Sequence, residues 1–492
     1  MLVLALAFLA CDGGKNGADG DAISIRLVNP TDADPMEEVD AFRLDLLIDG
    51  ELLESATFDL DEPWSLPGLT EYGQVRFEVA GLAGDEVVSY GRSAEIAVVP
   101  GVDRDVPITF LPVNEVLPLS VDLDLVQGRK GHEVTILPDG RALIHGGQGL
   151  TSDRPQNAMA VYDPSEGAVL ETELNLGYAV SDPVVAWDFQ QRLVYAGGAS
   201  DPLPTQTRLK NSAVLDPVAE TIDTLPPLNR KRFDHCFRFV RDGFAVAMGG
   251  TLPDLDLSSI ESLRSDGAGE GNLVWSEEEI PGLSGRGVNA CELTSDGRLF
   301  LQGATADSTG ELSAVESVGG GSPSLVFESI WADSISGNGW VDFSIGAALI
   351  PLETGAEGDA LVWVGGGLDL ESGSGAVATQ PRVYNLDAER FQMGFGSDLQ
   401  PRVDGDWGRW LDPGSVVLSC GYTDGNYNVG QSRIELFEPE NGASIGWWEL
   451  PNRRVGCESA VLKDGSVLVT GGQPESGEDQ PWISAILVPY ID

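Results

Sequence analysis

Basic residues are scarce in this sequence. Its 492 residues include 78 acidic side chains but only 29 lysines and arginines and three histidines, which gives a formal net charge of −49. A field of that sign repels phosphate backbones and anionic lipid headgroups. We therefore expect no nucleic-acid partner. Histidines are few and no Cys-x-x-Cys motif occurs, so the sequence predicts neither a metal site nor a cofactor.

Long stretches without glycine or proline are also rare, since the chain contains 61 glycines and 29 prolines. Both residue types interrupt helices, and they mark the turns that join short strands. The apolar fraction of 42% is large enough for a sizeable core. The composition therefore predicts an all-β fold.

One apolar segment stands at the N-terminus. Residues 2–10 are apolar and end in Phe8-Leu9-Ala10, and Cys11 and a polar, glycine-rich stretch follow. The segment is shorter than the roughly 20 apolar residues that span a bilayer, and it resembles a bacterial lipoprotein signal. That resemblance implies a signal peptide at 1–10, lipidation at Cys11 and a tether at 11–21. The protein would then lie in the cell envelope, outside the cytoplasm, held to the membrane by the lipid alone. An ordinary secretory signal and a part of the mature structure are the two alternatives.

Residues 22–112 show the alternation of half-buried strands. The segments 23–28, 42–48, 75–79 and 106–110 alternate apolar and polar side chains, and turn residues such as Asp49-Gly50 and Pro100-Gly101 separate them. About seven short strands in this length predict an antiparallel β-sandwich of immunoglobulin or fibronectin-like architecture.

The remainder of the chain is repetitive. An apolar strand that ends in a glycine pair, or in the remnant of one, occurs seven times at intervals of 51 to 63 residues. These strands end at 146–147, 197–198, 249–250, 302–303, 365–366, 420–421 and 471–472. Asp-Gly turns precede several of them, as at Asp139-Gly140 and Asp464-Gly465, and favour hairpins.

The repeats resemble Kelch repeats, the four-stranded blades also found in the central domain of galactose-oxidase-like proteins. The resemblance covers residues 115–492 and implies a seven-bladed β-propeller. The chain ends one strand short of a blade after residues 483–488, whereas 117–125 is a spare strand before the first repeat. We expect these two segments to pair and so to remove an exposed sheet edge.

Four repeats open with an arginine followed three residues later by His, Asn or Cys. The arginines are Arg129, Arg232, Arg286 and Arg454. In a propeller the innermost strands line a central channel. These arginines are candidate ligand-binding residues that would form an anion-receiving rim at its mouth. The alternative is that each guanidinium bonds to backbone carbonyls or acidic neighbours between blades.

The cysteines besides Cys11 fall in adjacent repeats. Cys236 and Cys291 form one candidate disulfide, and Cys420 and Cys457 form the other. Extracytoplasmic proteins often carry such bonds, but the sequence leaves buried free thiols equally open.

Catalysis has no motif in the sequence. Galactose oxidase chemistry needs copper held by two His and two Tyr, one Tyr crosslinked to Cys, and no cluster here supplies that set. We therefore expect a binding or scaffold module, not an enzyme, whose propeller recognises an envelope protein or a glycan. The alternative is an envelope carbohydrate-active enzyme with its site at the central channel, where two of the 78 acids would act as a pair.

Overall fold

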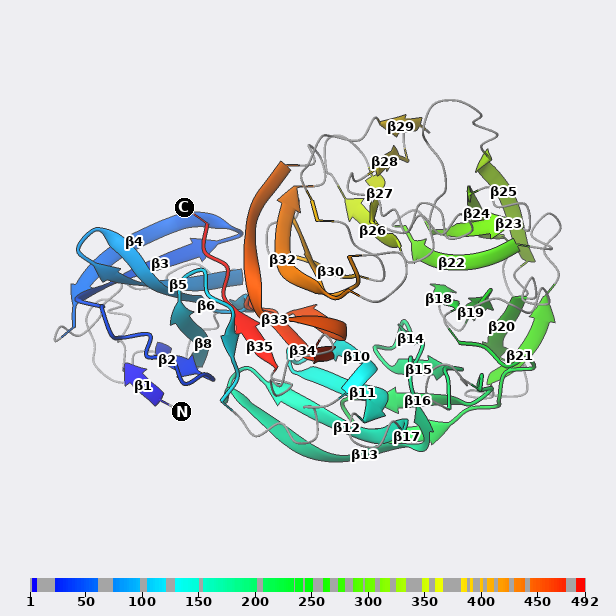
Figure 1. Ribbon diagram of the computed structural model, residues 1–492, viewed down its shortest axis with the longest axis horizontal. Helices are drawn as coiled ribbons and strands as arrows, with labels where there is room; N and C mark the ends of the chain where they lie inside the picture. The colour runs from blue at the N-terminus through cyan, green and yellow to red at the C-terminus, as the bar shows by residue number, and fades with distance from the viewer. Residues whose placement is uncertain are drawn as a thin grey trace, which may run out of the picture.

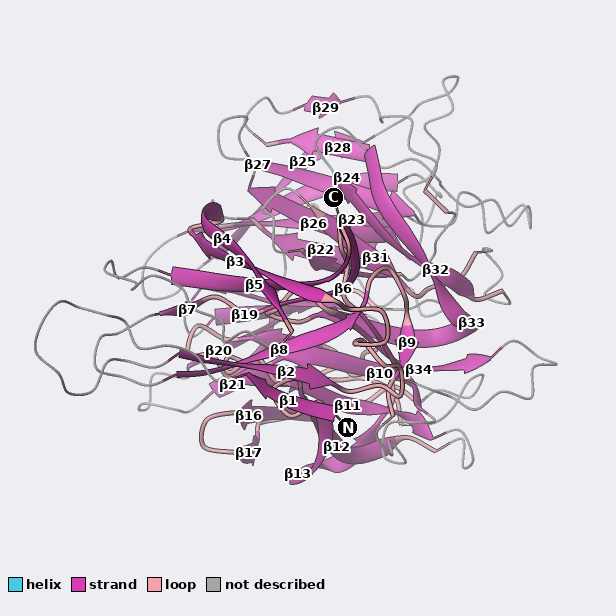
Figure 2. Cartoon of the chain, turned by 90° about the vertical axis from the view of Figure 1, so that its left-hand side faces the viewer, coloured by secondary structure: helices cyan, strands magenta, loops and turns pink. Residues whose placement is uncertain are grey.

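The protein is built from strands and loops in all the parts that its structure, a computed structural model, describes (Figure 2). Those parts are residues 2–6, 23–60, 74–97, 104–120, 129–149, 154–200, 207–233, 235–241, 244–250, 260–265, 273–278, 286–294, 297–305, 310–318, 324–332, 347–353, 359–365, 382–386, 390–392, 399–400, 405–410, 415–423, 429–438, 443–474 and 484–491. Over these ranges, no helix is long and apolar enough to span a bilayer. The all-β class predicted from composition is therefore confirmed.

The N-terminal region is one eight-stranded sheet. Its strands are β1 (Leu2–Leu6), β2 (Ile23–Asn29), β3 (Ala41–Ile48), β4 (Glu51–Asp59), β5 (Gln74–Ala83), β6 (Glu86–Arg92), β7 (Ile96–Ala97) and β8 (Arg104–Pro112). They pair in the order β1-β2-β8-β6-β5-β3-β4, with β7 on β5. Burial alternates along β3, so that Phe42, Leu44 and Leu46 enter the core.

One pairing in this region differs from the antiparallel arrangement that the sequence predicts. β2 and β8 run parallel, with Ile25 beside Val106 and Leu27 beside Ile108. Alternation shows which side chains face the core, but it does not give strand direction. A tight turn would force antiparallel pairing, and none joins these two distant strands.

The strand β1 lies inside the segment predicted as a signal peptide. It pairs antiparallel with β2, from Leu2 beside Asn29 to Leu6 beside Ile25. An apolar segment rich in Leu and Val readily extends an open sheet edge. Cys11 and the predicted tether at 11–21 lie outside the described residues.

Five antiparallel sheets of four strands follow, each paired in chain order. They contain β10 (Arg129–Ile136), β11 (Ala142–Gly149), β12 (Gln156–Asp163) and β13 (Ala168–Val180); β14 (Val185–Trp187), β15 (Leu193–Ala196), β16 (Ser212–Asp216) and β17 (Thr221–Thr224); β18 (Cys236–Arg241), β19 (Phe244–Met248), β20 (Ile260–Ser265) and β21 (Leu273–Glu278); β22 (Arg286–Leu293), β23 (Arg298–Thr305), β24 (Gly310–Val318) and β25 (Ser324–Ala332); and β26 (Ala347–Glu353), β27 (Asp359–Gly365), β28 (Arg382–Asn385) and β29 (Arg390–Gln392). In each sheet, the apolar strand that precedes the glycine pair or its remnant is the second strand.

The last sheet has seven strands because one long strand serves two repeats. Its members are β30 (Asp406–Arg409), β31 (Val416–Ser419), β32 (Gln431–Glu438), β33 (Ala443–Val461), β34 (Val467–Pro474), β35 (Ala485–Leu487) and β9 (Leu117–Pro118). The first half of β33 pairs with β32, and its second half pairs with β34. The sequence predicts that the last repeat begins near Arg454, but the backbone continues through this residue as one strand.

The last sheet is completed by a strand from before the first repeat. In β9, Leu117 lies beside Ile486 and Pro118 beside Ala485, and the Leu119 amide donates to the Ser484 carbonyl at 2.8 Å. This is the predicted pairing of residues 117–125 with 483–488, confirmed for the part that the structure describes.

The sheets succeed one another around a common centre, with β10, β14, β18, β22, β26 and β30 innermost (Figure 1). The inner strands contact one another in succession from β14 through β18, β22, β26 and β30 to β33, and β10 of the first sheet lies against β33 and β34 of the last. This arrangement fits a β-propeller-like fold.

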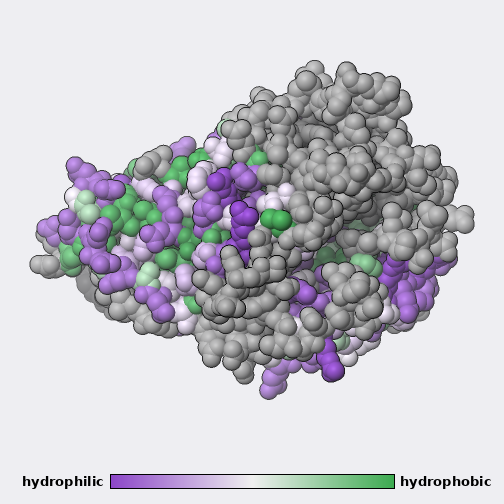
Figure 3. Space-filling model, in the orientation of Figure 1, coloured by the Kyte–Doolittle hydropathy of each residue, from purple (hydrophilic) through white to green (hydrophobic). Residues whose placement is uncertain are grey.

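The N-terminal sheet shares a core with the repeats. Leu82, Tyr90 and Leu111 belong to the same buried cluster as Ile144 and Ile486. The packing places the N-terminal sheet firmly against the first and last repeats. At the outer end of this sheet, green apolar residues lie among purple ones in Figure 3, and Leu52 and Leu53 of β4 are exposed.

Candidate functional site at the inner strands

The signature arginines hold the glycine pairs in place. The guanidinium of Arg129 donates to the Gly146 carbonyl at 3.1 Å, and Arg232 and Arg454 make the same bond to Gly249 and Gly471 at 3.0 and 3.3 Å. Each acceptor lies 17 residues after its arginine. These glycines have positive φ angles, a conformation that glycine adopts without strain. The repeated signature therefore has a structural role in three repeats.

These three guanidinium groups offer no rim for an anion. Arg129, Arg232 and Arg454 are at most 3% exposed, and Arg232 also pairs with Glu261 at 3.1 Å, where both side chains are fully buried. Burial lowers the pKa of Arg129 and of Arg454 to about 10. The structure therefore favours the alternative of backbone and acidic partners. Arg286 begins β22, but its side chain lies outside the description.

The histidines pack between sheets. His132 of the first repeat shares a hydrogen bond with the Thr470 hydroxyl of the last at 2.7 Å, and His145 shares one with Thr135 at 3.0 Å. Burial, aided by the nearby Arg129 charge, lowers the pKa of both imidazoles to about 3. Both rings are therefore neutral at pH 7, in the interior of the protein.

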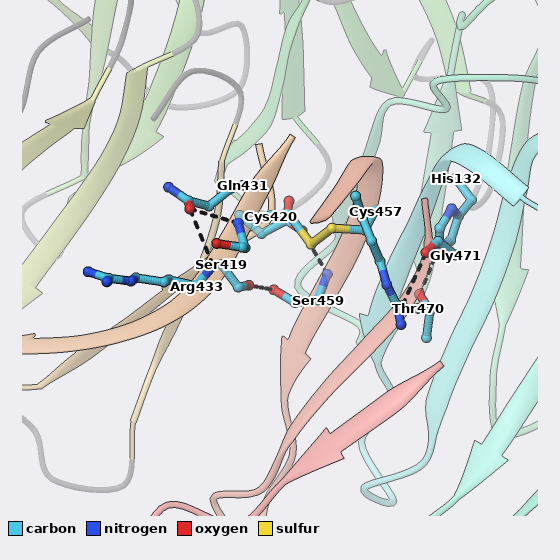
Figure 4. The surroundings of a disulfide bond; sticks show 12 residues. His132, Ser419, Cys420, Gln431, Arg433, Cys457, Ser459, Thr470 and Gly471 are labelled. Carbon is cyan, nitrogen blue, oxygen red and sulfur yellow. Dashed lines mark hydrogen bonds between the residues drawn. A yellow bond between two sulfur atoms is a disulfide. The ribbon is translucent and has the colours of Figure 1, made fainter. Parts of the chain in front are cut away.

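The cysteines pair between neighbouring repeats. Cys236 bonds to Cys291, with Cα atoms 5.5 Å apart, and Cys420 bonds to Cys457, with Cα atoms 5.6 Å apart. Both separations suit a disulfide. Figure 4 shows the second bond, with the hydrogen bond between Ser419 and Ser459 on one side and the His132–Thr470 contact on the other.

A group of carboxylates gathers where the first and last repeats meet. Glu133 lies on β10, Glu458 on the second half of β33 and Asp406 on β30, and all three side chains are half-buried. Asp406 accepts a hydrogen bond from the Ser459 amide at 2.7 Å. The three inner strands thus bring together carboxyl groups that are far apart in the sequence.

Proximity and burial change the titration of this carboxylate group. Burial raises the pKa of Glu133 to about 8, with a further increase from the Asp406 charge and a partial decrease from Arg238. Burial also raises the pKa of Glu458, and Asp406 and Glu133 add to that rise. Carboxyls that remain protonated at neutral pH while close to another carboxylate can act in acid–base chemistry.

Sequence reasoning missed these carboxylates, although the repeat contained a signal. Glu133 and Glu458 each directly follow the third residue after a signature arginine, so the first and last repeats share the pattern Arg-x-x-(His or Cys)-Glu. In the second and third of the four marked repeats, Cys236 and Ala290 occupy that position. The shared acid could have singled out the two repeats that meet.

Comparison with known proteins gives a likeness of fold. No family model matches the chain, and no curated protein matches it. Among solved structures, it is similar to a fungal alcohol oxidase of the AA5 family in complex with copper. The TM-score is 0.52 at 12% identity, over 74% of this chain and 75% of the oxidase. This likeness supports the galactose-oxidase-like fold.

The comparison corrects the expectation that the chain is not an enzyme. The similar structure is that of an oxidase, so sheets arranged in this way can carry catalytic groups. The lack of known catalytic motifs in the sequence says nothing about groups assembled from distant repeats. The inner-strand carboxylates are assembled in this way, from distant parts of the chain.

The residues present do not fit the copper of that oxidase. His132 and His145 each direct Nε2 to a threonine hydroxyl, and the nearby Arg129 charge that lowers their pKa would also repel a bound cation. Among the described residues, no group of three or more His, Cys, Asp or Glu side chains is placed to hold a metal ion. We therefore derive no step through copper.

Proposed function

We propose that this protein is a carbohydrate-active enzyme of the cell envelope that uses the inner-strand carboxylates Glu133, Glu458 and Asp406. The observation that carries the proposal is the meeting of these groups at the junction of the first and last repeats, where burial raises the pKa of Glu133 to about 8. A half-buried acid of this kind can donate a proton at neutral pH.

The chemistry follows from unequal environments. Cleavage of a glycosidic bond needs one carboxylic acid to protonate the leaving oxygen and one carboxylate to act as base or nucleophile. Glu133 is suited to the first role because its proton is held up to a pH of about 8. Asp406 is suited to the second, since the Ser459 amide donates to it and stabilises a negative charge. Arg238, bonded to Glu292 at 3.0 Å, supplies positive charge near Glu133.

The proposal includes a seven-bladed Kelch-type propeller over residues 115–492. The contact of β10 with β33 and the pairing of β9 with β35 support it, because both join the two ends of the repeat region. The division of β33 between two repeats supports counting the last sheet as two blades. A β-sandwich at 22–112, formed by folding of the eight-stranded sheet, belongs to the same proposal.

The envelope location rests on the N-terminal sequence. Signal cleavage before Cys11, with lipidation of that residue, would remove β1 and leave β2 at the sheet edge. The two disulfides are consistent with an oxidising compartment. The ligand would then be an envelope glycan.

The test is release of reducing sugar from a panel of bacterial envelope polysaccharides. Glu133→Gln, which removes the acid, and Asp406→Asn, which removes the second carboxylate, should each lower the rate by at least about 100-fold, in the range that removal of a general acid or base gives. Glu220→Gln, a change at an exposed acid in a turn, is the control and should leave the rate unchanged. Release that survives both inner-strand substitutions would overturn the assignment, as would an absence of release from every polysaccharide.

A further inference from the structure

A second candidate site lies away from the inner strands. A cavity of about 490 Å³ opens beside the first half of β33, between that strand, Asn114 of the segment after the N-terminal sheet, and Tyr490 near the C-terminus. In Figure 1 the red C-terminal tail runs between the N-terminal sheet and β33. The volume of the cavity is in the range of small-ligand sites, which often lie at junctions between domains.

The cavity presents an exposed indole. Trp447 is 51% exposed, although tryptophan is usually well buried. Arg433 lies on the neighbouring strand β32, and its guanidinium is 4.1 Å from the centre of the indole. Arg433 is held in turn by Glu449, directly opposite, at 3.0 Å. The indole is therefore fixed in position while half of its surface faces solvent.

The opposite wall is held in place as well. The buried Trp448 donates its indole N–H to the Asn114 side-chain oxygen at 2.9 Å. Asn114 has a φ of +60°, a conformation that asparagine tolerates better than most residues. Tyr490 packs on Tyr90 of the N-terminal sheet, with ring centres 5.0 Å apart. The cavity is thus formed before any ligand arrives, which reduces the entropy lost on binding.

The charges around the cavity select the class of ligand. The chain carries a net charge of −49, so an anionic ligand would be repelled. A cationic ligand would normally suit an indole beside a carboxylate, but Arg433 already contacts Trp447 and already pairs with Glu449. The lining of the cavity presents an apolar ring surface, an amide, a carboxylate and a phenol. A neutral, hydroxyl-rich ligand fits this set.

We propose that the cavity is a saccharide-binding subsite, in which Trp447 stacks on the apolar face of a neutral sugar and Asn114 and Glu449 bond to its hydroxyls. It rests on its own observations, so it stands whether or not the inner-strand carboxylates are catalytic. If they are catalytic, the subsite binds one part of a long glycan while another part of the same glycan reaches the inner-strand carboxylates.

The test uses calorimetric titration of the full chain with cellohexaose, mannohexaose and galactohexaose as neutral probes. Polygalacturonate and a lysine-rich peptide serve as anionic and cationic probes. Trp447→Ala should weaken binding of a neutral hexaose by about tenfold or more, and Trp447→Phe by less, because a smaller ring still stacks. Phe189→Ala, which removes an exposed aromatic that does not line the cavity, is the matched control and should have no effect.

Binding should be the same in Glu133→Gln as in the unmodified protein, which separates this subsite from the proposed catalytic centre. The proposal is overturned if none of the three neutral hexaoses binds, if one binds equally well to a folded Trp447→Ala variant, or if only the charged probes bind. A melting temperature close to that of the unmodified protein shows that the variant is folded.

Discussion

Cys420 occupies the position at which other repeats have the first glycine of the pair, and its side chain reaches Cys457, which stands where the first repeat has His132. The φ of Cys420 is +54°, close to that of Gly471 at +57°. A Cβ atom on Gly471 would approach His132 Cε1 to 2.5 Å, and one on Gly197 would approach His235 Cε1 to 3.0 Å. One repeat junction therefore replaces a glycine–histidine contact by a disulfide.

The first prediction concerns that disulfide. Replacing both Cys420 and Cys457 by Ser should lower the free energy of unfolding by about 2–4 kcal/mol, because the bond closes a loop in the unfolded chain. The double variant Cys420→Gly with Cys457→His should lose less, since it restores the glycine–histidine pair found at two other junctions and relieves a positive φ. Denaturant unfolding under oxidising conditions measures both. Equal losses in the two variants would contradict the equivalence of the junctions.

The second prediction concerns close approach at the glycine pair. Gly471→Ala should destabilise the fold by roughly 2–4 kcal/mol, because its Cβ would overlap the Arg129 carbonyl oxygen in addition to adopting a positive φ. Gly177→Ala is the control, with a φ of +76° but no atom near the added Cβ, and should lose only about 1 kcal/mol. Thermal unfolding of the two variants gives the comparison. A similar loss in both would show that the contact between repeats is not tight.

The third prediction concerns closure by β9. Replacing residues 115–126 with a glycine–serine linker of equal length should abolish cooperative unfolding of the repeat region. The change exposes the edge of β35 and removes Leu119 from the shared core. Calorimetry should then show a broadened transition at lower temperature. An unchanged transition would mean that β9 contributes nothing to closing the fold.

The fourth prediction is a dependence of stability on pH. The pKa of Glu133 rises on folding from 4.5 to about 8, so between these values the folded protein holds a proton that the unfolded chain releases. The stability linked to that proton is fully present below pH 4.5 and is lost as the pH rises towards 8. Compared with Glu133→Gln, the unmodified protein should lose on the order of 5 kcal/mol across this window, because each unit of pKa difference corresponds to about 1.4 kcal/mol.

The histidines act in the opposite direction and at lower pH. Burial lowers the pKa of His132, His145 and His235 from 6.5 to about 3. Their contribution to the free energy of unfolding is therefore lost as the pH falls from 6.5 to about 3. The comparison with Glu133→Gln cancels this effect, because both proteins contain the same histidines. Equal pH profiles for the two proteins would contradict the raised pKa of Glu133.

The sequence was informative wherever a local pattern determines the structure. The glycine pairs mark the second strand of each repeat, and the unmatched segments at 117–125 and 483–488 predict the β9–β35 pairing. The parallel direction of β2 and β8 could not be predicted, because no short turn joins these two strands. The continuity of β33 through Arg454 could not be predicted either, since no local pattern distinguishes one strand that serves two repeats from two separate strands.

The site was harder to predict than the fold. Glu133 and Glu458 are more than 300 residues apart, and only contact between the first and last repeats makes them neighbours. The signature arginines were singled out because they recur, but recurrence here reflects a shared backbone requirement at Gly146, Gly249 and Gly471. Groups that occur in only two repeats were passed over.

The most direct test is a carboxyl-carbon NMR titration of the protein labelled at glutamate, compared with Glu133→Gln and Asp406→Asn variants. The account predicts a resonance that titrates near pH 8, is absent from the Glu133→Gln variant and moves to lower pH in Asp406→Asn, which removes the neighbouring negative charge. If the Glu133 carboxyl titrates between about pH 4 and 5, as exposed glutamates do, the first and last repeats do not bring these acids together, and the proposed catalytic centre is wrong.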